Sequence, residues 1–316
     1  MHLQRFDFRR VPGAAYVLVA QIVLFGLIDR RFLSIDNFQN VAYQMSPLLV
    51  VSVGMTFVIL SEGIDLSQGG VVGLAGVVSA MLLVSGLGLV PSVLMGLLAG
   101  SLMGLLTGLV ISLGAVPPFV ATLGTLGISQ GLALGLSQGS SIAGLDETFQ
   151  FFGQGSWILP IPTWVALGVL LLFWGILRLT PFGTYVYSMG GNRDAMRYAG
   201  INVKGHLIWV YIISGLCSGI AALLMAAHDN AAHPRAAVGI EFDAIAAVIL
   251  GGTSFEKGRG TMLGSVAGAL TIAFLRNGLN FSGMPTTWQL PVVGMVIIVA
   301  IMVNEMMQRS LAREMA

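Results

Sequence analysis

The sequence predicts an all-α polytopic membrane protein with about ten transmembrane helices. Of its 316 residues, 56% are hydrophobic and only 9% are charged, whereas globular proteins carry about 25% charged residues. Long apolar runs, each close to the ~20 residues that cross a bilayer, are separated by short polar segments. The short alternating segments of a transmembrane β-barrel are not found. We therefore interpret the whole chain, 1–316, as a single transmembrane domain.

Ten apolar segments are candidates for spans: residues 11–28, 46–60, 69–84, 91–113, 117–136, 163–177, 207–227, 244–252, 262–281 and 287–303. Basic residues precede the first segment as in a signal sequence, but no small-residue cleavage site follows, so we expect an uncleaved span. The eighth segment is too short to cross alone. We expect it either to extend back through 240–243 or to be re-entrant and surrounded by protein or water.

The distribution of basic residues predicts that both termini are cytoplasmic. In that orientation 11 of the 15 basic residues face the cytoplasm, as the positive-inside rule requires: Arg5, Arg9, Arg10, Arg178, Arg193, Arg197, Lys204, Lys257, Arg259, Arg309 and Arg313. Arg30, Arg31 and Arg235 would be external, and Arg276 lies within a span. The loop 180–206 is then cytoplasmic, and the acidic loop 137–162 is external.

Glycines spaced by four residues mark the fourth and fifth predicted spans. The fourth carries Gly96, Gly100, Gly104 and Gly108, and the fifth carries Gly127, Gly131 and Gly135. Such faces let helix backbones approach closely where lipid gives no hydrophobic drive to associate. We expect both faces to be helix contacts.

A short internal repeat links two distant parts of the chain. Residues 58–63 read VILSEG and residues 248–253 read VILGGT, and a polar break and a pair of glycines follow each of them. The segments are six predicted spans apart and so share one membrane orientation. Parallel repeats and interrupted helices occur in transporters, although convergent glycine-rich turns would give the same pattern.

The cytoplasmic loop 180–206 contains a short segment, 192–200, that has the signals of a capped helix. Asn192 can accept hydrogen bonds from the first free N–H groups, and Asp194 suits the positive first turn. Gly200 can adopt the left-handed conformation that ends a helix. The segment is either a handle for a cytoplasmic partner or an ordinary solvated connection.

Charged residues within membrane segments are functional candidates because burying them is costly. Glu62 and Asp65 form either a functional site or a polar break that water reaches at a span end. Asp243 is a second candidate or the N-cap of the eighth segment. Arg276 lies deep in an apolar run, so we expect a partner carboxylate or a water-filled cavity, in a polar patch with Asn277 and Asn280.

No catalytic constellation is found, so a membrane enzyme is a poor interpretation. The chain lacks the glycine-rich phosphate loop that ends in Gly-Lys-Ser/Thr and should not hydrolyse nucleotide itself. His228 and His233 could ligate a metal, but they are five residues apart in an external loop and a solvated loop is favoured. Cys217 is the sole cysteine, in an apolar span, and is interpreted as a packing residue.

Four segments together carry a family resemblance. They read VGMTFVILSEGIDLSQGG, PPFVATLGTLGISQGLAL, GTYVYSMGGNRDAMRYAGINV and EFDAIAAVILGGTSFEKGRGTMLGSVAGALTIAFLRNGLNFSG. In this order they resemble the permease subunits of bacterial sugar ABC importers of the ribose, xylose, arabinose and galactose type. The resemblance implies a ten-span bacterial inner-membrane subunit that works as a pair. It also implies a separate ATPase that holds ATP and Mg²⁺, a periplasmic sugar-binding protein, contact with lipid, no cofactor in this chain and no nucleic-acid partner.

The resemblance gives residues 192–201 the role of the coupling helix that sits in a cleft of the ATPase. The residues concerned are Asn192, Arg193, Asp194, Arg197, Tyr198, Gly200 and Ile201. Candidates for the translocation pathway are Glu62, Asp65, Thr122, Thr125, Arg276, Asn277 and Asn280. The chain departs from the family pattern at Gln68-Gly69-Gly70, at Gln130 and at Arg276, and its external loop 228–235 is unusually charged.

Two other functions remain open at this point. An ion-coupled secondary transporter of a small polar solute would use Glu62 or Asp65 as a proton or sodium site. A structural subunit of a membrane complex would explain the spans but not the capped segment in the 180–206 loop.

Overall fold

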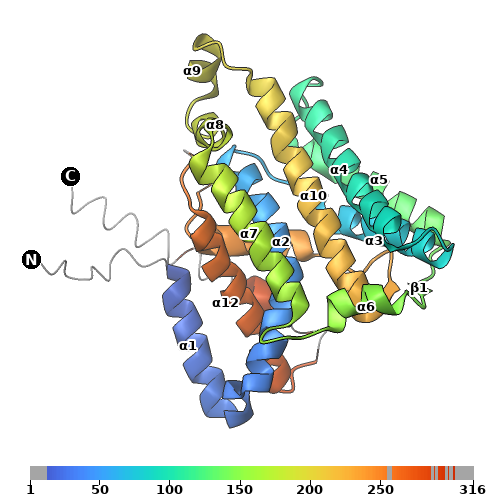
Figure 1. Cartoon of the computed structure of the whole chain (residues 1–316). Helices are drawn as coiled ribbons and strands as arrows, with labels where there is room; N and C mark the ends of the chain where they lie inside the picture. The colour runs from blue at the N-terminus through green and yellow to red at the C-terminus, as the bar shows by residue number, and fades with distance from the viewer. Residues whose placement is uncertain are drawn as a thin grey trace, which may run out of the picture.

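The computed structural model describes residues 13–254 and 258–285, together with positions 288, 291–295, 298 and 302. This part of the chain is a bundle of helices (Figure 1). The elements are α1 (Gly13–Ile28), the 3-10 helix η2 (Arg30–Leu33), α2 (Ile35–Leu60), α3 (Gln68–Val84), α4 (Leu89–Ser112), α5 (Pro118–Ser137), β1 (Ile142–Ala143), α6 (Glu147–Gln154), α7 (Ile161–Leu179), α8 (Pro181–Met189), α9 (Arg193–Tyr198), α10 (Val203–Asp229), β2 (Ala231–Ala232), α11 (Ile240–Leu250) and α12 (Met262–Phe281).

Six helices of the described residues are long and apolar enough to cross a bilayer: α2, α4, α5, α7, α10 and α12. Helices α1 and α3 are apolar but shorter. The prediction of an all-α polytopic membrane protein is therefore confirmed. The predicted number of about ten spans is not confirmed. Most of the tenth predicted span, 287–303, lies outside the described residues.

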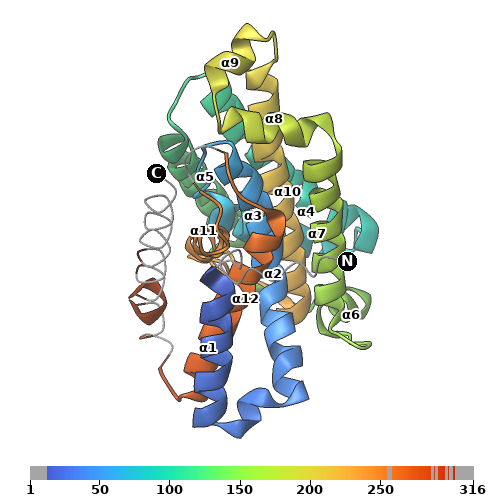
Figure 2. The ribbon, with the colours of Figure 1, turned by 90° about the vertical axis from the view of Figure 1, so that its left-hand side faces the viewer.

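Helix α11 is too short to span the membrane. Its 11 residues extend over roughly 16 Å, about half of the hydrocarbon core. It begins at Ile240, so the eighth segment does extend back through 240–243. Figure 2 shows α11 nearly end-on, whereas α1, α2 and α10 are seen from the side. Helix α11 thus lies across the bundle.

Side-chain caps explain where several helices begin. The side chains of Ser34, Thr180, Asn202 and Thr261 each accept a hydrogen bond from the backbone N–H three residues later. Each cap satisfies an N–H that the first helical turn leaves free. The cap at Ser34 starts α2 at Ile35, well before the predicted residue 46. The prediction missed residues 35–45 of α2 because polar side chains and Pro47 lower the hydropathy of the first half of the helix.

The predicted external loop 137–162 has structure of its own. Asp146 caps α6 by accepting from the N–H of Thr148, and β1 pairs antiparallel with β2. These elements join the loop to the end of α10.

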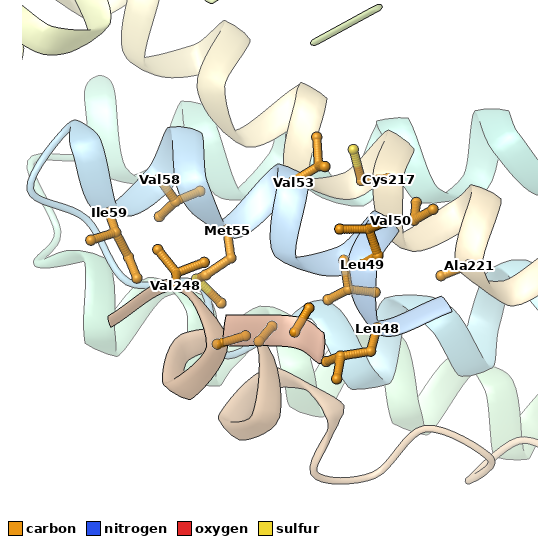
Figure 3. Packing of buried hydrophobic residues seen from close by; sticks show 14 of the residues in the cluster. Leu48, Leu49, Val50, Val53, Met55, Val58, Ile59, Cys217, Ala221 and Val248 are labelled. Carbon is orange, nitrogen blue, oxygen red and sulfur yellow. The ribbon is translucent and has the colours of Figure 1, made fainter. Parts of the chain in front are cut away.

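The core forms around α2, which contacts α7, α10, α11 and α12. Its second half is buried almost without interruption, and Val50, Val51 and Met55 are fully enclosed. Figure 3 shows α2 side chains packed between residues of α10, including Cys217 and Ala221, and Val248 of α11. Cys217 is a buried packing residue, as predicted.

The glycines of α4 bring its backbone against α10, as the spacing predicts. A Cβ atom at Gly100 would lie 2.5 Å from the carbonyl oxygen of Gly215, and one at Gly104 would overlap the carbonyl oxygen of Tyr211. At Gly108 it would lie 2.9 Å from the Cα of Ile208. No side chain larger than hydrogen fits this contact.

The glycines of α5 do not make the expected contact with the described residues. A Cβ atom at Gly127, Gly131 or Gly135 would meet nothing within 4 Å. Helix α5 instead packs through two other residues. Ser129 lies against Gly70 of α3, and Thr125 is hydrogen-bonded to Thr107 of α4. The spacing identified a face of small residues but not the side from which a neighbour approaches.

Candidate functional site

The predicted capped segment, 192–200, is a short helix with the expected ends. The Oδ1 atom of Asn192 accepts from the N–H of Ala195 at 2.9 Å, and Asp194 lies in the first turn of α9. Gly200 has a φ of +76°. Its N–H donates to Arg197 and the N–H of Ile201 donates to Met196, which is a Schellman motif.

Helix α9 lies at one end of the bundle (Figure 1), and its Asp194 and Arg197 side chains are exposed. Met196 is buried and holds the helix in place, whereas Tyr198 is 92% exposed. Arg197 and Asp194 form an exposed ion pair of 3.1 Å, worth little in stability. An exposed tyrosine beside ionic groups is a composition common at protein–protein contacts.

The two segments of the internal repeat end their helices in the same way. The N–H of Gly63 donates to Val58 at 2.9 Å, and the N–H of Thr253 donates to Val248 at 3.1 Å. The residue before each donor is left-handed, with a φ of +59° at Glu62 and +87° at Gly252. The repeat is therefore a shared local structure as well as a shared sequence.

The segment formed by α8 and α9 contacts the turns that follow both repeat helices. Arg193 donates from Nη2 to the carbonyl oxygen of Ser61 at 2.5 Å. A Cβ atom at Gly190 would lie 2.7 Å from the Cα of Gly258 and would overlap the carbonyl oxygen of Leu60. The α8–α9 segment is thus joined to the end of α2 and to the turn after α11.

Tyr187 of α8 adds a second link to the turn after α11. Its hydroxyl donates to the carbonyl oxygen of Gly260 at 3.2 Å. Burial raises the pKa of Tyr187, and the nearby charge of Arg178 opposes this only in part. The phenol therefore stays protonated and remains a donor at neutral pH.

Asp65 is buried, and this corrects the expectation that water reaches it. It is 2% exposed and accepts from the N–H and hydroxyl of Ser67 at 2.9 and 2.5 Å. The hydroxyl of Ser214 in α10 donates to it at 2.6 Å, and Gln68 donates to Ser214 at 2.9 Å. Glu62 is exposed, as a polar break at a span end predicts.

Arg276 has the partner carboxylate that its position predicted. Its Nη2 lies 2.6 Å from the Oδ2 of Asp243. Asp243 sits in the first turn of α11, and the N-cap is Gly239, so the N-cap interpretation of Asp243 is wrong. The side-chain carboxylate serves the ion pair between α11 and α12.

The neighbours of Arg276 make separate contacts. Asn277 exchanges two hydrogen bonds of 2.9 Å with Asn37 of α2, and Asn280 is exposed near the end of α12. Arg276 and Asn277 thus join α12 to different helices, and the expected polar patch is divided.

Thr122 and Thr125 are buried in the contacts of α5. Thr107 of α4 donates to the hydroxyl of Thr125 at 2.9 Å, and the hydroxyl of Thr122 donates to the carbonyl of Phe119 at 3.3 Å. Among the described residues, no hydrogen bond joins either threonine to Asp65 or Arg276.

Two buried polar side chains near Asp65, those of Glu241 and Gln68, were not among the site residues predicted from the sequence. Glu241 is 4% exposed, and a Cβ atom at Gly69 would overlap its Oε2 atom. That Oε2 atom and the Oε1 atom of Gln68 are buried without a hydrogen-bond partner among the described residues. The sequence signal for Glu241 was its position two residues before Asp243, just ahead of the eighth predicted segment, 244–252.

The two histidines predicted in an external loop serve local contacts, and His228 lies in the last turn of α10 instead. The His228 ring lies 3.9 Å from that of Tyr43, and His233 Nδ1 is hydrogen-bonded to Ser141 at 2.5 Å. In the part of the chain that the structure describes, no group of three or more His, Cys, Asp or Glu residues could hold a metal ion.

Comparison with known proteins decides the family. A family model described as "Branched-chain amino acid transport system / permease component" matches residues 37–301, which is well over half of the chain. The chain belongs to this permease family. It is therefore a component of a transport system and not an enzyme. The four segments quoted above all fall within the matched residues.

Curated relatives of the permease cover nearly its whole length. It is 38% identical over 286 residues to the ribose import permease protein RbsC of Bacillus subtilis, covering 90% of this chain and 89% of the relative. It is 35% identical over 300 residues to the D-allose transport system permease protein AlsC of Escherichia coli, covering 94% and 92%.

A third relative carries a different sugar in its name. The permease is 34% identical over 324 residues to the galactose/methyl galactoside import permease protein MglC of Haemophilus influenzae, covering 95% of this chain and 96% of the relative. No solved structure matches the permease. The resemblance to permeases of sugar importers is confirmed by these relatives.

The ion pair between α11 and α12 gives a testable prediction for the permease. Asp243→Ala leaves Arg276 without a partner and should destabilise the fold by roughly 2 kcal/mol, less than for a fully buried pair because Arg276 is 35% exposed. Thermal unfolding in lipid nanodiscs measures the effect. Adding Arg276→Ala should restore part of the loss, and a double variant less stable than Asp243→Ala would contradict the pairing.

Proposed function

We propose that this permease is the membrane-spanning subunit of an ATP-driven ABC importer. It moves a sugar or sugar-like polyol across the bacterial inner membrane, with both termini in the cytoplasm. The names of the relatives, which import ribose, allose and galactose, support the substrate class. The sequence has no phosphate loop, which supports a separate ATPase as the source of energy.

The observation that carries the proposal is the contact of the α8–α9 segment with both repeat turns. In our proposal a separate ATPase binds α9, and Tyr198 and Arg197 lie on the exposed side that meets it. Movement of α9 then reaches α2 through Arg193 and Ser61. It reaches the turn after α11 through Tyr187 and Gly260.

Buried polar contacts extend this path into the bundle. The segment that begins at Ser61 leads to Asp65, whose carboxylate is bonded to Ser214 of α10. Helix α10 also follows α9 directly in the chain. A displacement of α9 therefore acts on α2, α3 and α10 together, which suits alternating access in a cavity between two copies of the permease.

The partners follow from this scheme. A second permease copy completes the pathway, and the ATPase holds ATP and Mg²⁺ below the membrane. A periplasmic sugar-binding protein delivers the substrate from above. Because that protein selects the sugar, the pathway needs few high-affinity groups, and Thr122, Thr125, Asn277 and Asn280 stay candidates for it.

The ion-coupled alternative is less well supported than the importer. The carboxylate of Asp65 already accepts three hydrogen bonds from Ser67 and Ser214, and Glu62 is exposed. The relatives, whose names describe import permeases, also favour the importer.

Reconstituted transport tests the proposal. Proteoliposomes that contain the permease and its ATPase should take up sugar only when ATP is inside and the binding protein is outside. Dissipating proton and sodium gradients should leave uptake unchanged. Uptake that persists without the ATPase and collapses with an ion gradient would overturn the importer function.

The end of α9 offers a prediction about the docking of the ATPase. Gly200→Val should weaken ATPase binding while membrane insertion survives, since positive φ is costly for a β-branched residue. A Cβ atom at Gly200 meets nothing within 4 Å, so the strain is confined to the backbone. Co-purification of the ATPase with the variant measures the effect, and unchanged assembly would show that 192–200 is not the docking segment.

A further inference from the structure

A cavity of about 480 Å³ opens between α2, the turn from α6 to α7 and the end of α10. Its volume falls in the range of roughly 300 to 1,000 Å³ that is typical of small-molecule sites. Helix α6, which forms part of its wall, lies toward the end of the bundle opposite α9 (Figure 1). The polar residues that line it are Gln39, Asn40, Tyr43, Gln44, Gln154, Ser156, His228 and Asp229.

One face of α2 supplies most of these groups. Gln39 and Tyr43, like Asn40 and Gln44, are four residues apart and so lie on the same side of the helix. No hydrogen bond within the described residues engages the side-chain amides of Gln39, Asn40 and Gln44. Amides left open to lipid would be costly in a membrane helix, which implies that they face water or a ligand.

A proline adds a backbone acceptor to the same wall. Pro47 lies inside α2 and lines the cavity. Because proline has no N–H, the carbonyl oxygen of Tyr43 one turn earlier lacks its usual helical donor. Tyr43 also lines the cavity, so this acceptor lies in the same part of α2 as the polar side chains.

Contacts among the other elements hold the cavity open in a fixed shape. Gln154 donates to the carbonyl oxygen of His228 at 2.8 Å, and Gly153 packs against the backbone of Ala227 so closely that a Cβ atom would overlap it. The rings of Tyr43 and His228 lie 3.9 Å apart. A preformed site loses less entropy when it binds a ligand.

The lining selects a neutral, hydroxyl-rich ligand. Each amide offers two donors and an acceptor, which suits hydroxyl groups that both donate and accept. Neither lysine nor arginine lines the cavity among the described residues, and Asp229 does, so a phosphorylated solute is disfavoured. The polar α2 face also suits a branched aliphatic side chain poorly.

Two tryptophans place the cavity near a membrane surface, which is the external one in the proposed orientation. Trp157 is 81% exposed and Trp164 is 43% exposed, and their rings lie 6.3 Å apart. Tryptophan is enriched at the membrane–water interface. Since Ser156 and Pro160 beside them line the cavity, a solute arriving from outside reaches the cavity from water.

We propose that this cavity is an external binding site for a neutral monosaccharide or similar polyol, one in each permease chain. The inference rests on the proposed function as an importer. The site holds the sugar by the amides of Asn40 and Gln44 and the free carbonyl of Tyr43 after the binding protein releases it.

Saturation-transfer NMR on the permease in lipid nanodiscs tests the site. The probes are ribose, allose and galactose, with leucine and glucose 6-phosphate as comparison solutes. At least one neutral sugar should bind, and Asn40→Leu with Gln44→Leu should weaken it roughly tenfold or more through the loss of several hydrogen bonds. Leucine at these exposed positions of an apolar helix does not oppose insertion.

Glu147→Gln is the matched control, because Glu147 is exposed on α6 but does not line the cavity. It should bind sugar like the wild type, and equal thermal stability of all variants confirms their folding. No binding by any of the three sugars, equal binding by the double variant, or a preference for leucine or glucose 6-phosphate would overturn the proposal.

Uptake in proteoliposomes separates this inference from the importer function. The double variant should need several-fold more sugar-loaded binding protein for half-maximal ATP-driven uptake. Normal ATP-driven uptake by the double variant would reject the cavity and leave the importer intact. Wild-type uptake that does not depend on ATP would reject the importer instead.

Discussion

Gly104→Val should destabilise the permease by about 3 kcal/mol or more, the upper end for overpacking, because the added side chain has no space to enter. A Cβ atom at this position would overlap the carbonyl oxygen of Tyr211 and lie 3.1 Å from the Cα of Ile212. These are backbone atoms, so no change of rotamer relieves the clash. The two helices must separate, and buried contacts along both are lost.

Thermal unfolding of purified protein in nanodiscs measures this effect, and gel filtration shows whether the variant stays monodisperse. Gly131→Val is the matched control, since a Cβ atom at Gly131 of α5 meets nothing within 4 Å. Both variants carry the same propensity cost of a β-branched residue in a helix. Equal stability of the two would show that the α4–α10 backbone contact does not hold the fold together.

Arg193→Ala should reduce ATP-driven uptake roughly tenfold while the ATPase still binds, since a hydrogen bond from a charged donor contributes about 1.5 to 3 kcal/mol. Arg193 points inward to the carbonyl oxygen of Ser61. Its loss therefore removes the link from α9 to α2 without altering the exposed side of α9. The variant should show sugar-independent ATP hydrolysis, which is the signature of uncoupling.

Two variants separate transmission from docking. Lys204→Ala removes a positive charge from an exposed position in the first turn of α10 and should transport normally. Arg197→Ala alters the exposed side of α9 and should weaken ATPase binding instead. If Arg193→Ala lowers ATPase binding as much as Arg197→Ala does, Arg193 docks the ATPase and does not transmit its movement.

Local chemistry explains which features the sequence predicted. The α9 helix was found with its ends because Asn192 and Gly200 act on atoms within a few residues of themselves. The partner of Arg276 was predicted as a carboxylate because a charge in an apolar helix requires one. Its identity as Asp243 needed the packing of α11 against α12.

Features that depend on packing were not predictable. The same glycine spacing produced a backbone contact in α4 and an open face in α5, because spacing does not say where a neighbouring helix lies. The start of α2 was missed since its polar face, Gln39 to Gln44, lines a cavity whose other walls come from α6, the turn from α6 to α7, and α10. The residues of such a site are far apart in the sequence, so no local pattern identifies them.

The backbone contact between α4 and α10 limits how the permease can change shape. Where Gly100 and Gly104 meet Gly215 and Tyr211, no flexible side chains lie between the helices to absorb a sliding movement. A shift by a fraction of a turn would bring backbone atoms into collision. Helices α4 and α10 must then travel as one rigid unit, and any bending in a transport cycle falls to the connections around that unit.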